Sequence, residues 1–146
     1  MSGLQFDDFV PGVISQKTHS IIDYIHAGTN FVAAAIFYKR GNSRAGHAAA
    51  ALGASVLMNA LMTDYEYGVF RVWSFKTHGM LDYGVAATSA AFPKLLDIEG
   101  TPEATYFYAQ GGGETAIASI SDYNDNSGSR RRFGSANPSY RGKRAA

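Results

Sequence analysis

Cysteine is absent from the 146 residues of this chain. That absence excludes a disulfide framework, thiolate metal ligands and a cysteine nucleophile. A phosphate-binding loop is also missing, because no Lys-Ser or Lys-Thr pair follows the glycines at 111–113. No serine-hydrolase elbow occurs either. The common nucleotide-binding and hydrolase motifs are therefore absent, and the sequence leaves the question of enzymatic activity open, leaning toward a non-enzymatic role.

Charged residues are scarce in the long apolar stretches and abundant only near the C-terminus. Segment 45–61 carries no Asp, Glu, Lys or Arg, whereas six of the thirteen Lys and Arg residues follow residue 124. The first thirteen residues have no basic segment followed by an apolar one, so we expect no cleavable signal peptide. The composition of residues 124–146 predicts a disordered basic tail.

One unit of sequence is used twice. Segment 17–24, KTHSIIDY, returns fifty-nine residues later as KTHGMLDY at 76–83. Segment 62–65, MTDY, returns fifty-eight residues later as ISDY at 120–123. The chain is therefore predicted to consist of two tandem halves, residues 17–66 and 76–124.

The apolar periodicity and the capping signals predict two helices in each half. Residues 1–16 are expected to form an extended lead-in, and Pro93 is expected to end or kink the third helix. The predicted helices are approximately 18–38, 43–63, 77–92 and 103–121. The fold class is thus all-α: a four-helix bundle over residues 17–123, built from two tandem helical hairpins with pseudo-two-fold symmetry.

Polar residues on each predicted helix form one narrow stripe. In the first helix His19, Asp23, His26 and Asn30 follow an i, i+4, i+7, i+11 spacing, and apolar residues surround them. A water-soluble bundle shows the reverse, a thin apolar seam within a charged surface. A helix of about twenty residues also spans roughly 30 Å, the hydrocarbon thickness of a bilayer. We predict a transmembrane bundle, with a soluble ligand-binding helical bundle as the alternative.

Four spans place both termini on one side of the membrane. That side carries nine Lys and Arg residues against four on the other, so both termini are predicted to be cytoplasmic. The basic tail is expected to contact anionic lipid headgroups rather than nucleic acid. Small residues on the outer helix faces would also allow a homodimer.

A Thr-His-x-x-x-Asp-Tyr motif opens the first and third helices, at 18–24 and 77–83, and Thr-Asp-Tyr-Glu-x-Gly lies between the halves at 63–68. This combination resembles the SPW-repeat family of small bacterial membrane proteins over residues 17–123. The Ser-Pro-Trp tripeptide itself is not retained. The resemblance implies a multi-pass protein of the bacterial cytoplasmic membrane, in a family without an established biochemical role.

Helical hairpins bring the repeated acidic and imidazole side chains to one end of the bundle. The predicted polar cluster comprises His19, Asp23, His78, Asp82, Asp64 and Asp122. Our leading interpretation is a structural or accessory membrane protein in which this cluster orders the bundle by hydrogen bonding. The alternatives are a divalent metal site at His19, Asp23, His78 and Asp82, or a proton-coupled or small-ligand site. The tyrosines that follow the repeated aspartates, Tyr24, Tyr65, Tyr83 and Tyr123, are expected to form an interfacial aromatic belt.

Overall fold

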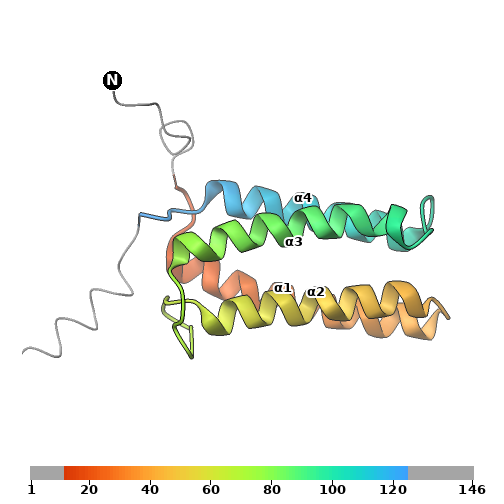
Figure 1. Cartoon of the computed structure of the whole chain (residues 1–146), viewed down its shortest axis with the longest axis horizontal. Coiled ribbons are helices and arrows are strands. Elements are labelled where there is room, and N and C mark those ends of the chain that lie inside the picture. Colours follow the sequence, from red (N-terminus) through yellow and green to blue (C-terminus); the bar gives the residue numbers. More distant parts are fainter. Residues whose placement is uncertain (1–11, 125–146) are drawn as a thin grey trace, which may run out of the picture.

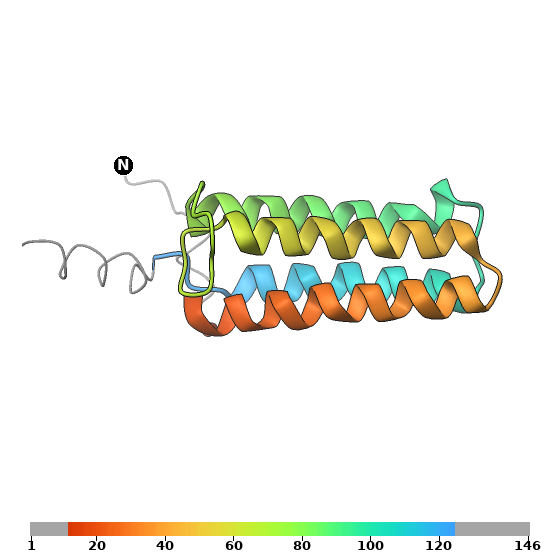
Figure 2. The ribbon, with the colours of Figure 1, turned by 90° about the horizontal axis from the view of Figure 1, so that it is seen from below.

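The computed structural model describes residues 12–124, and these form four antiparallel helices. The helices are α1 (Gln16–Lys39), α2 (Ser43–Met62), α3 (Phe75–Leu95) and α4 (Pro102–Ile120). Figures 1 and 2 show two hairpins in a square arrangement, with α1 beside α4 and α2 beside α3. No named strand occurs among the described residues, so the predicted all-α four-helix bundle is confirmed. The first eleven residues of the predicted lead-in and nearly all of the predicted tail lie outside the described residues.

The two halves begin with the same cap. Ser15 and Ser74 are the N-cap residues of α1 and α3, and their side chains accept hydrogen bonds from the backbone N–H groups of Thr18 and Thr77. At the C-terminal end of α3, the expectation that Pro93 ends the helix is wrong, since α3 continues through it to Leu95. Proline is tolerated there because it removes only one hydrogen bond from the last turns of the helix.

The helices of each hairpin pack closely at equivalent glycines, Gly53 of α2 and Gly111 of α4. A Cβ atom at Gly111 would lie 2.8 Å from the carbonyl oxygen of Ala86, and one at Gly53 would lie 3.2 Å from that of Ala27. Both carbonyls belong to the partner helix of the same hairpin. The repeated glycine therefore allows the two helices of each hairpin to approach closely.

The bundle has an apolar core at one end and a polar core at the other. Alanines together with Phe37, Leu52 and Phe107 fill the end where α1 and α3 finish. The buried side chains toward the opposite end are largely polar: His19, Asp23, Asn59, Thr63, His78, Asp82 and Ser121. The repeat motifs, which lie at this second end, thus determine where the polar groups are buried.

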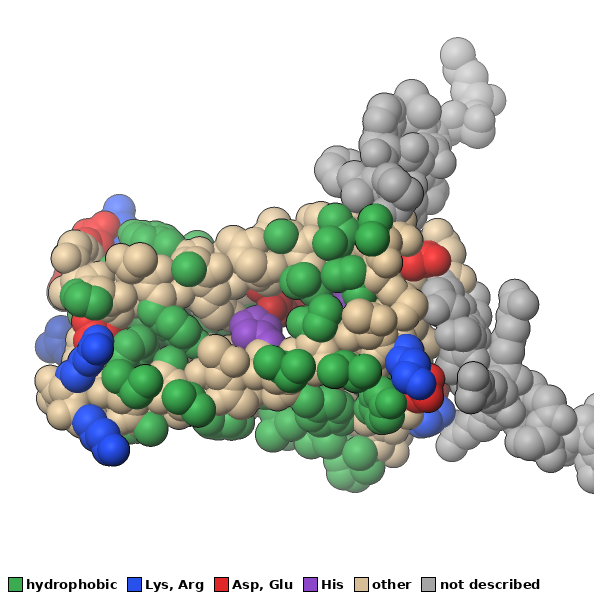
Figure 3. All heavy atoms as spheres, turned by 180° about the vertical axis from the view of Figure 1, so that it is seen from behind, with side chains coloured by type: hydrophobic (Ala, Val, Ile, Leu, Met, Phe, Trp, Pro, Cys, Tyr) green, Lys and Arg blue, Asp and Glu red, His purple; other side chains and the backbone are tan. Residues whose placement is uncertain are grey.

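The surface is apolar along the middle of the bundle. Large side chains such as those of Ile25, Val32 and Met80 are more than 60% exposed. Figure 3 shows hydrophobic side chains along the length of one face, with Lys and Arg gathered at the two ends. By length and composition, α1 and α2 are apolar enough to cross a membrane.

Candidate functional site

Four buried side chains meet at the polar end, two from α1 and two from α3; we refer to His19, Asp23, His78 and Asp82 as the His/Asp cluster. Each is at most 3% exposed. The Nε2 atoms of His19 and His78 lie 3.2 Å apart. Asp23 places Oδ1 3.3 Å from His19 Nε2 and Oδ2 3.2 Å from His78 Nε2. Asp82 Oδ2 lies 3.3 Å and 3.1 Å from the same two nitrogens. The cluster therefore brings the Nε2 atoms of two imidazoles and the oxygens of two carboxylates into contact.

The opposite ring nitrogens of the two histidines contact hydroxyl groups. His78 Nδ1 lies 2.7 Å from Thr63 Oγ1, and His19 Nδ1 lies 2.6 Å from Ser121 Oγ. Both hydroxyls already donate their protons to backbone carbonyls one helical turn earlier, those of Asn59 and Ile117. Each hydroxyl must therefore accept a hydrogen bond from Nδ1–H of its histidine. A neutral histidine at either position then has its Nε2 lone pair directed into the cluster.

These hydroxyl contacts cross between the hairpins. Thr63 ends the first hairpin and binds the histidine of the second, whereas Ser121 ends the second hairpin and binds the histidine of the first. The two contacts are equivalent under the repeat. Each hairpin thus orients the imidazole ring of the other, which makes the site a joint product of both halves.

The carboxylates have different supporting donors. The Tyr65 hydroxyl donates to Asp23 Oδ2 at 2.8 Å, and the Asn59 amide donates to Asp82 Oδ1 at 2.9 Å. Burial, together with the charge of Asp23, raises the pKa of the Tyr65 hydroxyl, so it remains a donor. Trp73 Nε1–H in turn fixes the other side of the Asn59 amide, at 3.1 Å from its Oδ1. Asp82 Oδ2 is buried and has no hydrogen-bond partner.

The cluster contains a ligand set suited to a metal ion. One atom each from His19, Asp23 and His78 can be chosen so that all three lie within 4.8 Å of one another. Two imidazoles with a carboxylate suit zinc, iron or manganese. The Nδ1–H bonds to Thr63 and Ser121 are the outer contacts that orient histidine ligands at such sites. The residues present therefore fit a divalent transition metal.

Asp64 and Asp122 were also predicted to join the cluster, but the structure shows them in other contacts. Asp64 is half-buried and pairs with Arg71 at 3.4 Å, in the segment between the hairpins. Asp122 is half-buried and accepts the backbone N–H of Asn124 at 3.0 Å. At the end of each hairpin, the preceding hydroxyl residue, Thr63 or Ser121, supplies the contact to the cluster instead.

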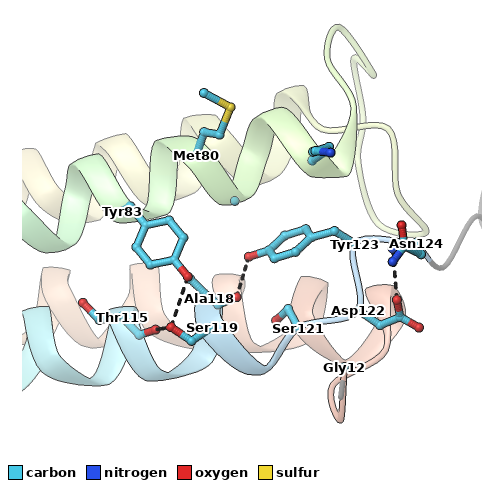
Figure 4. A pocket seen from close by; sticks show the side chains of 12 residues that line it. Gly12, Met80, Tyr83, Thr115, Ala118, Ser119, Ser121, Asp122, Tyr123 and Asn124 are labelled. Atoms are coloured by element: carbon cyan, nitrogen blue, oxygen red, sulfur yellow. Dashed lines mark hydrogen bonds between the residues drawn. The ribbon is translucent and has the colours of Figure 1, made fainter. Parts of the chain in front are cut away.

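Tyr65 and Tyr123 occupy equivalent positions but lie differently. Tyr65 is completely buried, so its assignment to an aromatic belt is wrong. The Tyr123 ring lies over Gly79, where a Cβ atom would clash with it, and its hydroxyl donates to the Ala118 carbonyl. The ring lines a hollow of about 580 Å³. Figure 4 shows it next to the Tyr83 ring, close to α4. The first half has Ser20 where the second has Gly79, a sequence difference that permits this placement only in the second half.

Sequence reasoning placed Asn59, Thr63 and Ser121 on the polar stripes of their helices but did not assign them to the cluster. Thr63 and Ser121 form part of the second repeated motif, and a hydroxyl at the same place in both copies was the signal that could have identified them. Asn59 and Trp73 have no polar equivalent in the other half, at Ile117 and Ile14, so the repeat carried no information about them.

No protein-family model matches the chain, and no curated protein or solved structure matches it significantly. The resemblance to the SPW-repeat family therefore stays a prediction, and the site is interpreted from its own geometry.

Proposed function

We propose that this protein is a small integral membrane protein whose two hairpins jointly hold one divalent transition-metal ion at the His/Asp cluster. The metal acts as a cross-link between α1 and α3 at the end where the hairpins meet. The polar cluster thereby orders the bundle, in keeping with a structural or accessory role rather than an enzymatic one.

The distribution of charge supports the membrane setting. Within the middle turns of the helices the acidic residues are Asp23, Asp82 and Glu114, and all three are buried. The surrounding surface consists of apolar side chains that water would solvate poorly. Ionisable residues that point into a bundle and pair there are the arrangement that a bilayer permits.

The observation that carries the metal assignment is the approach of the two Nε2 atoms to 3.2 Å while both Nδ1 atoms contact hydroxyl acceptors. Two protonated rings would place two N–H groups and two positive charges face to face at this distance. Two ligands that each lie about 2.0–2.1 Å from a metal are about 2.8–3.4 Å apart at coordination angles from about 90° to about 109°. The nitrogen separation falls in that interval.

Charge balance is consistent with a metal ion. When both imidazoles are neutral ligands, the two carboxylates leave two negative charges in the buried cluster, which is costly in a low-dielectric interior. One divalent cation neutralises them. Asp82 Oδ2, which is buried and accepts no hydrogen bond, is an available acceptor for this positive charge.

Elemental analysis of the protein purified from membranes tests the metal assignment. We expect about one divalent transition-metal ion per chain, lost in His19→Ala and in His78→Ala. His47→Ala is the matched control, because His47 is exposed on α2 and contacts the Ser43 carbonyl, away from the cluster. If the wild-type protein carries no stoichiometric metal, the metal assignment fails and the cluster is a hydrogen-bonded clamp.

Fractionation tests the membrane setting separately. We expect the protein to sediment with membranes after an alkaline carbonate wash and to require detergent for release. Recovery in the soluble fraction without detergent would contradict this part of the proposal and would favour a soluble bundle.

A further inference from the structure

A second polar group lies deeper in the bundle, in a groove between α1 and α4. The groove has a volume of about 420 Å³, and its lining includes Asp23, His26, Gln110, Gly113 and Glu114. Figure 3 shows a histidine and acidic side chains in a hollow at mid-length of the face opposite to that of Figure 1. The groove thus connects the outer surface with the edge of the His/Asp cluster.

The polar residues of the groove form a chain that ends in an unused acceptor. His26 Nδ1 lies 2.6 Å from Glu114 Oε2, and His26 Nε2 lies 2.8 Å from Gln110 Nε2. With Nδ1–H donating to the carboxylate, Nε2 accepts the Gln110 amide N–H. Gln110 is only 9% exposed, and its Oε1 atom is buried without a hydrogen-bond partner. A buried polar atom of this kind carries a free-energy cost, and a donor in the groove relieves it once the Gln110 side chain turns toward the groove.

This chain of polar residues is specific to one side of the bundle. The repeat places Val85, Leu52 and Val56 where His26, Gln110 and Glu114 stand, and of these Leu52 and Val85 line a hollow between α2 and α3. Both hairpins fold alike with either set. The polar set is therefore not required by the hairpin fold itself, and a separate function explains it better than packing does.

The rest of the groove selects the class of ligand. Its walls are largely apolar, with Ile22, Ala109, Ala116 and Ile117 among the lining residues. A Cβ atom at Gly113 would meet nothing within 4 Å, so the wall leaves room there. An anion would approach the carboxylates of Asp23 and Glu114, and Glu114 is already paired with His26. The groove thus suits an uncharged, mainly apolar molecule with one hydrogen-bond donor.

We propose that the α1/α4 groove binds a lipid-soluble alcohol, of phenolic or isoprenoid type, whose hydroxyl donates to Gln110 Oε1. The apolar body of the ligand lies along the small residues of α4. The inference rests on the proposed membrane setting, because the groove opens toward the hydrocarbon, but it does not require the metal ion.

The test uses para-octylphenol and its methyl ether, para-octylanisole, which has the same apolar body without the donor. Equilibrium binding is measured to the full chain in lipid nanodiscs. We expect the phenol to bind at least about tenfold more tightly than the ether, the effect of one satisfied buried acceptor. Gln110→Leu, which introduces the residue found at the equivalent position of the first hairpin, should remove this preference.

Gly113→Leu should abolish binding by filling the groove. Gly112→Leu is the matched control: a Cβ atom there also meets nothing within 4 Å, but Gly112 lines a different hollow, between α3 and α4. Circular dichroism and thermal melting establish that all three variants fold. Equal binding of phenol and ether, or phenol binding that survives Gly113→Leu, would overturn the inference.

The outcomes separate this inference from the proposed metal site. Phenol binding by a protein that contains no metal would support the groove and refute the metal site. A metal-loaded protein that does not distinguish phenol from ether would refute the groove alone. A protein released without detergent would remove the membrane setting on which the choice of ligand rests.

Discussion

The two hairpins place the same groups at the His/Asp cluster and different groups where they meet away from it. His19 and Asp23 of the first hairpin have the equivalents His78 and Asp82, and the hydroxyl that orients each imidazole is also repeated. On the α1/α4 side the contact between hairpins is polar and includes His26. The equivalent positions on the α2/α3 side are aliphatic.

This difference indicates which parts of the site the duplication explains. The metal ligands require both copies, since each hairpin contributes only one imidazole to the cluster. The groove also lies between the hairpins, with His26 from the first and Gln110 and Glu114 from the second, but the repeat has valine or leucine at all three equivalent positions. Shared residues therefore define the central site, and unshared residues define what is particular to one side.

The largest expected effect comes from removing the metal. Chelation leaves two buried carboxylates without a counter-charge, so we expect the free energy of unfolding in detergent to fall by about 3 kcal/mol or more. The double variant Asp23→Asn, Asp82→Asn should be insensitive to chelator, since it lacks those charges. Thermal melting with and without chelator measures both. A wild-type melting temperature that chelator does not change would contradict the proposed cross-link.

The repeated hydroxyls provide the next test of the symmetry. Ser121→Ala and Thr63→Val each remove the acceptor that orients one imidazole, and we expect each to weaken metal affinity by about 10–100-fold. Competition with a chromophoric chelator gives the affinities. Ser55→Ala is the control, because Ser55 is exposed on α2 and donates to the Ala51 carbonyl. An effect of only one of the two hydroxyl variants would show that the halves do not contribute alike.

The equivalent tyrosines should respond unequally. Tyr65→Phe removes a buried donor to the Asp23 carboxylate, and we expect it to cost about 2 kcal/mol of stability. Tyr123→Phe removes a hydrogen bond to the Ala118 carbonyl and should cost about 1 kcal/mol. Thermal melting of both variants in the same detergent measures the two losses of stability. Equal losses would mean that the Asp23 contact has no special weight.

The smallest expected effects concern glycine in α4. Gly111→Ala directs a methyl group at the Ala86 carbonyl and should destabilise the protein by about 1 kcal/mol or more. Gly112→Ala meets open space and should stabilise the helix by up to about 1 kcal/mol. Opposite shifts of the melting temperature would confirm the close approach of α3 and α4. A shift of the same sign in both variants would contradict it.

The repeat made most of the fold predictable from sequence. Two copies of a motif that opens a helix, each followed by an apolar run and a turn, predict two hairpins with their ends together. The helix bounds differ from the predicted ones by at most three residues, most at α3. The sequence did not predict that α3 continues past Pro93. Proline has no backbone N–H, and the sequence does not show whether a helix tolerates the loss of one hydrogen bond near its end.

The candidate site was only partly predictable. Facing copies of one motif predict that His19, Asp23, His78 and Asp82 converge, but they do not determine which neighbouring side chains turn inward. Thr63 rather than Asp64 contacts a cluster histidine because adjacent residues at a helix end point in different directions. Tyr65 reaches Asp23 from forty-two residues away, a long-range contact that no local pattern encodes.

X-ray absorption at the metal edge of the purified, metal-loaded protein tests the central claim most directly. The account predicts two imidazole nitrogens at about 2.0–2.1 Å from a single metal ion, with carboxylate oxygen in the same shell. In the His78→Ala variant the imidazole scattering should fall or vanish together with the metal. A spectrum without imidazole ligands, or a wild-type protein that takes up no metal, would contradict the account.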